Sequence, residues 1–374
     1  MTTNKILKKI VLFFILRPVF HVLNTKWNET DYLQTIPENY TNDASLLSLT
    51  KVDSIVSVPV DKEQINEQLQ SLLKYAQENN LKISIGGAQH SMGGHTIYPD
   101  GILINMLAYN QMELDSVTNI LTIGSGALWE DAIKYLDKKG KSIAVMQAFS
   151  SFSIGGSISV NGHGWQKDLP PVSSSVISFT IMNYQGEVIN CSPKENLELF
   201  KLVLGGYGLF GIILDVKLKV VNNTSLKFSN INLNPKNYVE TYKTLVSENK
   251  DIELIFGRLR ISKKKFLEDA TLGYFERTGD KPAPLDTNLD YETKRIIFRT
   301  TANSEYGKRL RWNLETGMNK ISEGALYSRN DILNDHVDLI KNKDSSSTDI
   351  LHEYFIPARN FNQFIESIKP ILLN

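Results

Sequence analysis

Cysteine is nearly absent from this chain of 374 residues, which contains only Cys191. A single cysteine excludes an internal disulfide and any zinc or iron–sulfur site that needs several thiolates, and we predict no metal site. Cys191 is given no catalytic role, because no histidine can be placed beside it from the sequence. The cysteine content does not distinguish a reducing from an oxidising compartment, since chains without disulfides occur in both.

The chain also has no excess of positive or negative charge. Lys+Arg and Asp+Glu both number 41, so the formal net charge is zero. Without a basic field to hold a phosphate backbone, we expect no nucleic-acid partner. With 41% hydrophobic and 22% charged residues, the composition excludes a disordered or fibrous chain and fits one large or two medium globular domains.

No apolar run is long enough to span a bilayer. At the N-terminus, lysines within residues 5–9 precede the apolar residues 10–16, and Arg17-Pro18 interrupts the run. A signal peptide shares this pattern, but no small-residue cleavage site follows. Residues 1–25 are therefore predicted either to contact a membrane surface, as a weak uncleaved anchor or interfacial helix, or to pack on the domain as a first helix. The localisation stays open between cytoplasmic and membrane-associated.

From residue 52 onward the sequence alternates between strand and helix patterns. Asp61 opens a predicted helix with apolar residues on one face, namely Ile65, Leu69, Leu72, Leu73 and Ala76. Ser192-Pro193 is predicted to cap a helix that ends at Val203. A further helix is expected over 129–138, and strands are expected over 55–60, 82–85, 102–106, 120–124, 177–184, 187–190 and 212–221.

Beyond Asn222 the sequence is more charged, and a second domain is predicted to begin near this residue. Strands are expected there over 252–261 and 351–357, and a terminal helix from about residue 360. Because residues 371–374 form an apolar end with no polar tail, we expect the chain to be a fragment with an incomplete second domain.

Three glycine-rich segments follow one another along the chain. Residues 206–211 match G-x-G-x-x-G, but a helix is expected before them and a strand after them, the reverse of the order that a nicotinamide-dinucleotide site requires. The loops 86–94 and 153–164 hold glycines and small residues whose backbone N–H groups can surround an anion such as a diphosphate. Each loop alone is better explained as a turn that needs positive φ.

Together the three segments carry more information. The sequences G-G-A-Q-H-S-M-G-G, S-I-G-G-S-I-S-V-N-G-H-G-W and E-L-F-K-L-V-L-G-G-Y-G-L-F-G-I-I, in this order, resemble the FAD-binding domain of the vanillyl-alcohol oxidase and p-cresol methylhydroxylase (PCMH) superfamily. The resemblance covers roughly residues 52–221. It implies an α+β chain with a two-part α/β PCMH-type FAD-binding domain over 48–221 and a cap domain with an antiparallel sheet over 222–374.

The resemblance also implies roles for single residues. His90 stands where relatives with covalent FAD bond a histidine to the C8 methyl group of the flavin, although His90 could also merely line the loop. A second covalent bond is not expected, because no cysteine lies in the second loop. His95 is expected to be an ordinary loop residue. The remaining implied contacts are Gly86, Gly87, Ala88, Gln89, Ser91, Met92, Gly93, Gly155, Gly156 and Ser157 around the pyrophosphate, Asn161, Gly162 and His163 at the isoalloxazine edge, and Gly211 and Ile213 at the adenosine end.

The implied reaction is the transfer of a hydride from a carbinol or amine carbon to the flavin, with oxygen or another acceptor reoxidising it. The cap should supply a base and hydrogen-bond donors. Side chains two residues apart on a strand lie on the same face of the sheet, although most charged residues in strands simply face solvent. The candidates are Arg258 and Arg260 on one strand, and His352 and Tyr354 on the other with Glu353 opposite.

Family frequency favours a hydroxylated small molecule of sugar, polyol or lipid-linked type as substrate. Cytokinin is disfavoured, because cytokinin dehydrogenases carry an aspartate in a W-T-D-Y-L stretch before the second glycine loop, where this chain has residues 148–152, A-F-S-S-F. One alternative is an FAD-binding protein without turnover, caused by an incomplete cap. Another is an anion-binding module in which the glycines are structural.

Overall fold

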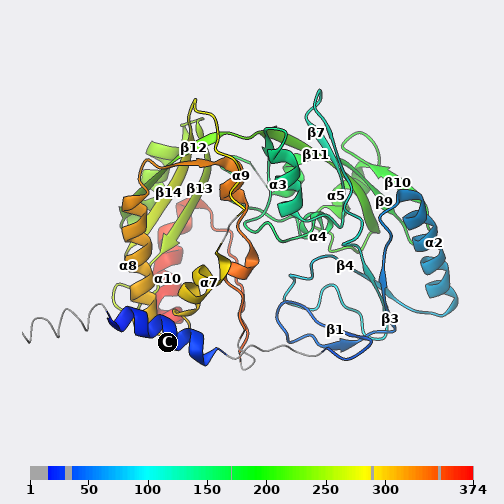
Figure 1. The fold of residues 1–374 in the computed structure, drawn as a ribbon, viewed down its shortest axis with the longest axis horizontal. Helices are drawn as coiled ribbons and strands as arrows, with labels where there is room; N and C mark the ends of the chain where they lie inside the picture. Colours follow the sequence, from blue (N-terminus) through cyan, green and yellow to red (C-terminus); the bar gives the residue numbers. More distant parts are fainter. Residues whose placement is uncertain (1–15, 30–35, 170, 288–289, 344–346, 374) are drawn as a thin grey trace, which may run out of the picture.

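The computed structural model describes residues 16–29, 36–169, 171–287, 290–343 and 347–373. They form two lobes that lie side by side (Figure 1). The first lobe comprises residues 36–222, and the second lobe comprises residues 16–29 and the described residues from 225 onward. The last strand of the first lobe ends at Asn222, and the first strand of the second lobe begins at Ser225.

The first lobe contains a small parallel sheet of order β3-β5-β4, formed by β3 (Ser54–Ser57), β4 (Ile83–Gly86) and β5 (Ile102–Asn105). Helix α2 (Lys62–Glu78) packs on it with Ile65 and Leu69 fully buried. Asp61 caps this helix as predicted, because its carboxylate accepts the N–H groups of Glu63 and Gln64. The parallel pairing brings the carboxyl ends of the three strands to one edge.

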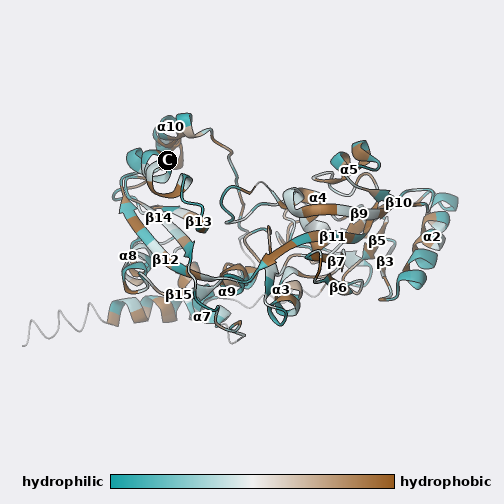
Figure 2. Cartoon of the chain, turned by 90° about the horizontal axis from the view of Figure 1, so that it is seen from above, coloured by the Kyte–Doolittle hydropathy of each residue, from teal (hydrophilic) through white to brown (hydrophobic). Residues whose placement is uncertain are grey.

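A larger antiparallel sheet completes the first lobe. Its order is β10-β9-β11-β7-β6, and β8 pairs with β11. The strands are β6 (Met112–Asp115), β7 (Ile120–Gly124), β8 (Lys141–Ile143), β9 (Val176–Met182), β10 (Val188–Cys191) and β11 (Ile212–Asn222). The apolar stretches of β9 and β11 are visible in Figure 2. Helix α3 (Trp129–Asp137) buries Trp129 against this core.

Two predictions about the first lobe are wrong. Residues 154–160, expected to be loop, form helix α4 (Ile154–Val160), because Ile154 and Ile158 are fully buried and the indole N–H of Trp129 donates to Ser157 at 2.8 Å. Ser192-Pro193 does not cap a helix. It forms a turn, and α5 (Leu197–Val203) begins only after Asn196.

The second lobe is built on an antiparallel sheet of order β13-β14-β12-β15. Its strands are β12 (Ser225–Leu233), β13 (Ile252–Leu259), β14 (Ala270–Arg277) and β15 (Leu326–Ser328). Its helices include α6 (Tyr238–Tyr242), α7 (Tyr291–Arg299), α8 (Glu305–Ile321), α9 (Arg329–Leu333) and α10 (Phe361–Leu373). The predicted fold class, with an α/β first part and an antiparallel sheet in the second, is therefore confirmed.

The strand predicted over 351–357 is wrong, since these residues are extended but pair with no other strand among the described residues. The alternation of their side chains nevertheless holds. The rings of His352 and Tyr354 stack at 6.3 Å, whereas Glu353 faces His163 of the first lobe. A strand requires a hydrogen-bonding neighbour, which the alternation of side chains alone does not supply.

The N-terminal segment packs on the second lobe. Residues 16–28 are helical, and the imidazole of His21 lies 3.1 Å from the carbonyl oxygen of Thr300 and edge-on to the ring of Tyr306. This agrees with the prediction of a packed first helix for the part of residues 1–25 that the structure describes, and residues 1–15 lie outside the described residues. Among the described helices, none has the length and apolarity that crossing a bilayer would require.

Candidate functional site

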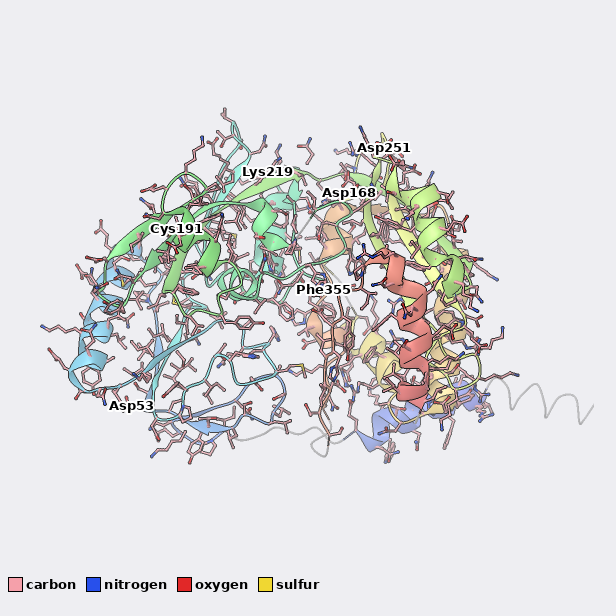
Figure 3. All side chains as sticks on the ribbon, turned by 180° about the vertical axis from the view of Figure 1, so that it is seen from behind. Asp53, Asp168, Cys191, Lys219, Asp251 and Phe355 are labelled. Carbon is pink, nitrogen blue, oxygen red and sulfur yellow. The ribbon has the colours of Figure 1, made fainter. Side chains whose placement is uncertain are left out.

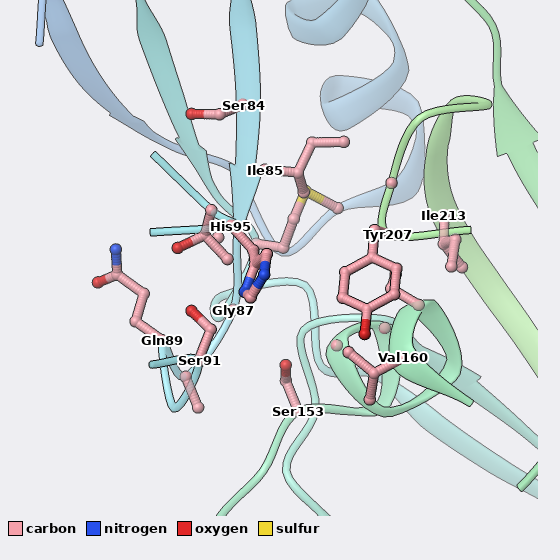
Figure 4. A pocket seen from close by; sticks show the side chains of 18 of the residues that line it. Ser84, Ile85, Gly87, Gln89, Ser91, His95, Ser153, Val160, Tyr207 and Ile213 are labelled. Atoms are coloured by element: carbon pink, nitrogen blue, oxygen red, sulfur yellow. The ribbon is translucent and has the colours of Figure 1, made fainter. Parts of the chain in front are cut away.

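A cavity of about 370 Å³ opens where the two sheets of the first lobe meet (Figure 4). Its walls come from the carboxyl end of β4, the start of α4 and the loop between α5 and β11. Predicted residues that line it are Gly86, Gly87, Ala88, Gln89, His90, Ser91, Gly155, Gly156, Ser157, Gly211 and Ile213. Residues from three distant parts of the chain thus share one cavity.

The first wall is the loop that follows β4. Gln89 has a φ of 52°, a left-handed conformation of the kind that lets successive N–H groups converge on an anion. Buried Asp43 holds the far side of the loop, because its carboxylate accepts the N–H of Gly94 at 2.6 Å. The N–H of Ala44 also donates to the carbonyl of Ser91 at 3.0 Å. The loop is therefore fixed by the segment before β2 (Thr50–Lys51).

The second wall is the start of α4, where two glycines allow close contact. A Cβ at Gly87 would lie 2.1 Å from the hydroxyl oxygen of Ser153, and one at Gly155 would lie 2.9 Å from the Cβ of Ser125. These distances are far below a van der Waals contact. Glycine is required at both positions because the β4 loop, α4 and β7 approach one another across them.

The third wall is the loop of residues 205–211. Helix α5 precedes it and strand β11 follows it, which is the order that argues against a nicotinamide-dinucleotide site. Tyr207 has a φ of 52°, and its N–H donates to the carbonyl of Ser159. Its ring lies 5.4 Å from the ring of His95 and faces the cavity (Figure 4).

Several buried polar atoms of residues that line the cavity have no hydrogen-bond partner among the described residues. They are the hydroxyl oxygens of Ser84, Ser91, Thr96 and Ser125 and the amide oxygen of Gln147. Buried polar groups normally find a partner, so a cavity that leaves five of them unpaired suits a polar ligand. Apolar side chains such as Ile85, Met106 and Val160 line the rest of the cavity and suit ring systems.

His90 lies on the cavity wall against Phe152, with ring centroids 4.7 Å apart. Burial lowers the pKa of His90, and a hydrogen bond with the backbone of Ser151 partly opposes this. The imidazole is therefore neutral at pH 7 and carries a nitrogen lone pair.

Five predicted cofactor residues do not line the cavity, namely Met92, Gly93, Asn161, Gly162 and His163. Asn161 ends α4 in a left-handed conformation, and the chain there turns toward the second lobe. The Nε2 of His163 lies 3.7 Å from the carboxylate of Glu353, and its ring packs edge-on against Phe355. Figure 3 shows Phe355 at the junction between the lobes.

The cap candidates are not gathered in one place. Arg258 pairs with Glu315 at 3.4 Å, and Arg260 is held by Asp269 and the hydroxyl of Ser262, both at 2.9 Å. The Tyr354 ring packs on Phe364 of α10. Of the candidates, Glu353 is the one whose carboxylate lies beside His163 of the first lobe. Burial also raises the pKa of Cys191 to about 11, so its thiol is protonated at neutral pH.

Sequence reasoning missed several residues of the cavity. His95, expected to be an ordinary loop residue, lines it together with Tyr207. Phe152 directly precedes the second glycine segment and Ser153 is its first residue, so their position was a usable signal. Ser125 and Gln147 carried no signal, because they reach the cavity only through the folding of β7 and β8.

Most of the cavity lies in a part of the chain that is similar to known proteins. Residues 63–192, which include the first two walls, match the family described as FAD binding domain. Residues 63–192 therefore form a domain similar to known FAD-binding domains. Among solved structures, a histidine-to-alanine variant of cholesterol oxidase from Brevibacterium sterolicum shares the fold, with a TM-score of 0.63 and 15% identity over 84% of this chain and 65% of that one.

Curated relatives of the FAD-binding domain include enzymes of different specificity. Cytokinin dehydrogenase 2 from Arabidopsis thaliana is 31% identical over 38% of this chain and 29% of its own length. L-gulonolactone oxidase from Mus musculus is 28% identical over 41% of this chain and 35% of its own length. The chain thus spans about a third of the curated relatives that it matches.

The cavity of the FAD-binding domain fits FAD in its chemistry. The glycine walls and unpaired hydroxyl groups suit phosphate and ribose oxygens, whereas the apolar side chains and the rings of Phe152 and Tyr207 suit the two ring systems. Among the residues that the structure describes, no cluster of three or more His, Cys, Asp or Glu side chains could hold a metal ion.

Proposed function

We propose that the protein is an FAD-dependent oxidoreductase that takes a hydride from a hydroxyl-bearing carbon of a sugar, polyol or related small molecule. The observation that carries the proposal is the cavity whose glycine walls come from the three predicted segments and whose lining residues include five with unpaired polar atoms. When bound, FAD supplies the hydride acceptor. The relatives named lactone oxidases support a hydroxylated substrate, and oxygen or another acceptor takes up the electrons.

His90 is proposed as the covalent attachment point of the cofactor. Its ring lines the cavity, packs on Phe152 and stays neutral because burial lowers its pKa. A neutral imidazole offers the lone pair that forms a bond to carbon. His95 lines the same cavity and is the alternative attachment point, since its ring faces inward beside Tyr207.

The proton of the substrate hydroxyl group needs an acceptor. We assign this role to the pair of His163 and Glu353, whose side chains meet at 3.7 Å between the lobes. Both side chains are about half exposed, so a substrate that enters between the lobes can reach them. The carboxylate would orient the imidazole and stabilise its protonated form.

The test is acid precipitation of the purified protein, with the visible spectrum and intact mass of the pellet recorded for the wild type and for His90→Ala and His95→Ala. We expect a yellow wild-type pellet with the mass of one added FAD, retained in His95→Ala and lost in His90→Ala. If only the His95→Ala pellet lacks flavin, the attachment point is His95 and not His90. A yellow supernatant would refute the covalent bond, and colourless native protein would refute the proposed function.

A further inference from the structure

The helix of residues 16–28 has an unusual orientation on the second lobe. Its partly buried residues are Pro18, His21, Val22 and Thr25, and polar side chains make its directional contacts with the lobe. The guanidinium carbon of Arg17 lies 4.1 Å from the ring centre of Tyr306, His21 lies 3.1 Å from the carbonyl oxygen of Thr300, and Glu29 pairs with the buried Arg295 just after the helix. The side of the helix that carries Pro18, His21, Val22 and Thr25 therefore faces the protein.

The apolar side of the same helix faces away from the protein. Its residues recur at intervals of three and four, which places them on one helical face. We call this face the apolar stripe, and it consists of Leu16 (51% exposed), Val19 (52%), Phe20 (69%), Leu23 (59%) and Trp27 (89%). In a soluble amphipathic helix this face would normally pack on the core. Figure 2 shows the brown bands of the helix at the outer edge of the second lobe.

The charge of the segment indicates what covers the stripe. Residues 1–28 contain five Lys or Arg residues and no Asp or Glu, although the whole chain has zero net charge. Residues 10–15, directly before the stripe, are all apolar. A basic segment with an apolar face and an exposed tryptophan has the chemistry of helices that lie in the interface of an anionic bilayer.

We propose that the apolar stripe docks the protein on the surface of an anionic lipid bilayer, with the helix lying in the interfacial plane. The polar contacts to Tyr306 and Thr300 then hold the second lobe against the membrane. A second copy of the chain is the competing occupant, but the concentration of positive charge at the stripe opposes its association with itself.

The proposal is tested with the full chain and vesicles of phosphatidylcholine, alone or mixed with phosphatidylglycerol. We expect the wild type to float with the mixed vesicles at low salt, to be released at high salt, and to show a blue shift of tryptophan emission that Trp27→Phe abolishes. The double variant Phe20→Glu/Leu23→Glu should bind at least about tenfold more weakly, because burial of one such side chain is worth a factor of ten or more.

The matched control is Val117→Glu/Tyr184→Glu, which changes two exposed side chains of the first lobe (91% and 70% exposed) and alters the net charge equally. It should bind mixed vesicles as the wild type does. The proposal is overturned if the wild type fails to bind mixed vesicles, if Phe20→Glu/Leu23→Glu binds equally well, or if the control loses binding to the same extent. A wild-type dimer that dissociates in Phe20→Glu/Leu23→Glu, without vesicle binding, would assign the stripe to a second copy instead.

Discussion

The contact between Gly87 and Ser153 gives a sharp test of how the cavity is built. The φ of Gly87 lies outside the left-handed region, so alanine is permitted by the backbone and the obstacle is steric. Its Cβ would lie 2.1 Å from the oxygen and 2.9 Å from the Cβ of Ser153. Rotation of the hydroxyl group relieves only the first contact. The β4 loop must therefore move away from α4 by about 1 Å, a displacement large enough to disturb positioned groups.

We expect Gly87→Ala to cost about 2–3 kcal/mol, the usual range for overpacking a tight contact. If the strain falls on the cofactor site, FAD affinity drops by about 30-fold to 150-fold. Ser153→Gly removes both clashing atoms, so the double variant Gly87→Ala/Ser153→Gly should recover most of the affinity. Ser153→Gly alone should have a small effect, because the Ser153 side chain makes no capping hydrogen bond to α4.

The assay is titration of the apoprotein with FAD, followed by flavin fluorescence. All variants are made in a His90→Ala background so that binding stays reversible. The control is Gly279→Ala, because nothing lies within 4 Å of a Cβ there. Unchanged affinity in Gly87→Ala, or no recovery in the double variant, would refute the reasoning that the β4 loop and α4 form one rigid cradle.

Two further predictions concern stability. Arg329 is buried and binds Glu253 at 2.8 Å and the carbonyl oxygen of Ala144 at 3.0 Å, so Arg329→Met should lower the unfolding free energy in a urea titration by about 2–4 kcal/mol. Arg258→Met, which breaks a half-exposed pair, should cost less than about 1 kcal/mol, and equal effects would contradict the argument. Burial lowers the pKa of His90 in the folded protein, so as the pH falls this histidine is protonated in the unfolded chain before it is protonated in the folded protein. The free energy of unfolding should therefore fall as the pH drops below about 6.5. In thermal melts of the apoprotein His90→Gln should lose less stability over this range, and parallel pH profiles would refute the assignment.

The sequence predicted those elements best whose patterns are local. Strand β7 and helix α2 begin where they were expected, since alternation and the Asp61 cap are read within a few residues. Helix α4 was missed because glycine, serine and asparagine are poor helix formers. Its helical state depends on tertiary contacts, namely the burial of Ile154 and Ile158 and the hydrogen bond from Trp129. No local pattern reports such contacts.

The residues of the candidate site also divide into those that a local pattern predicts and those that only tertiary contacts bring to the cavity. The glycine segments were found from sequence because their composition is unusual, and they do form walls of one cavity. Ser125 and Gln147 come from segments with no unusual composition. They reach the cavity because the antiparallel pairing of β7 and β8 with β11 places the segments that follow them beside α4. Long-range sheet pairing therefore completes a site that local motifs only outline.

The second lobe is coupled to the proposed attachment point through three hydrogen bonds at residues 150 and 151. The N–H and hydroxyl groups of Ser150 both donate to the backbone oxygen of Asp335, and the N–H of Val337 donates to the hydroxyl oxygen of Ser151. Phe152, which packs on His90, follows directly in the chain. Charges of the second lobe also act on the pKa of His90, which His336 and Lys341 lower and Asp338 raises. A change in how the second lobe sits on residues 150–152 would therefore alter both the packing and the protonation of His90.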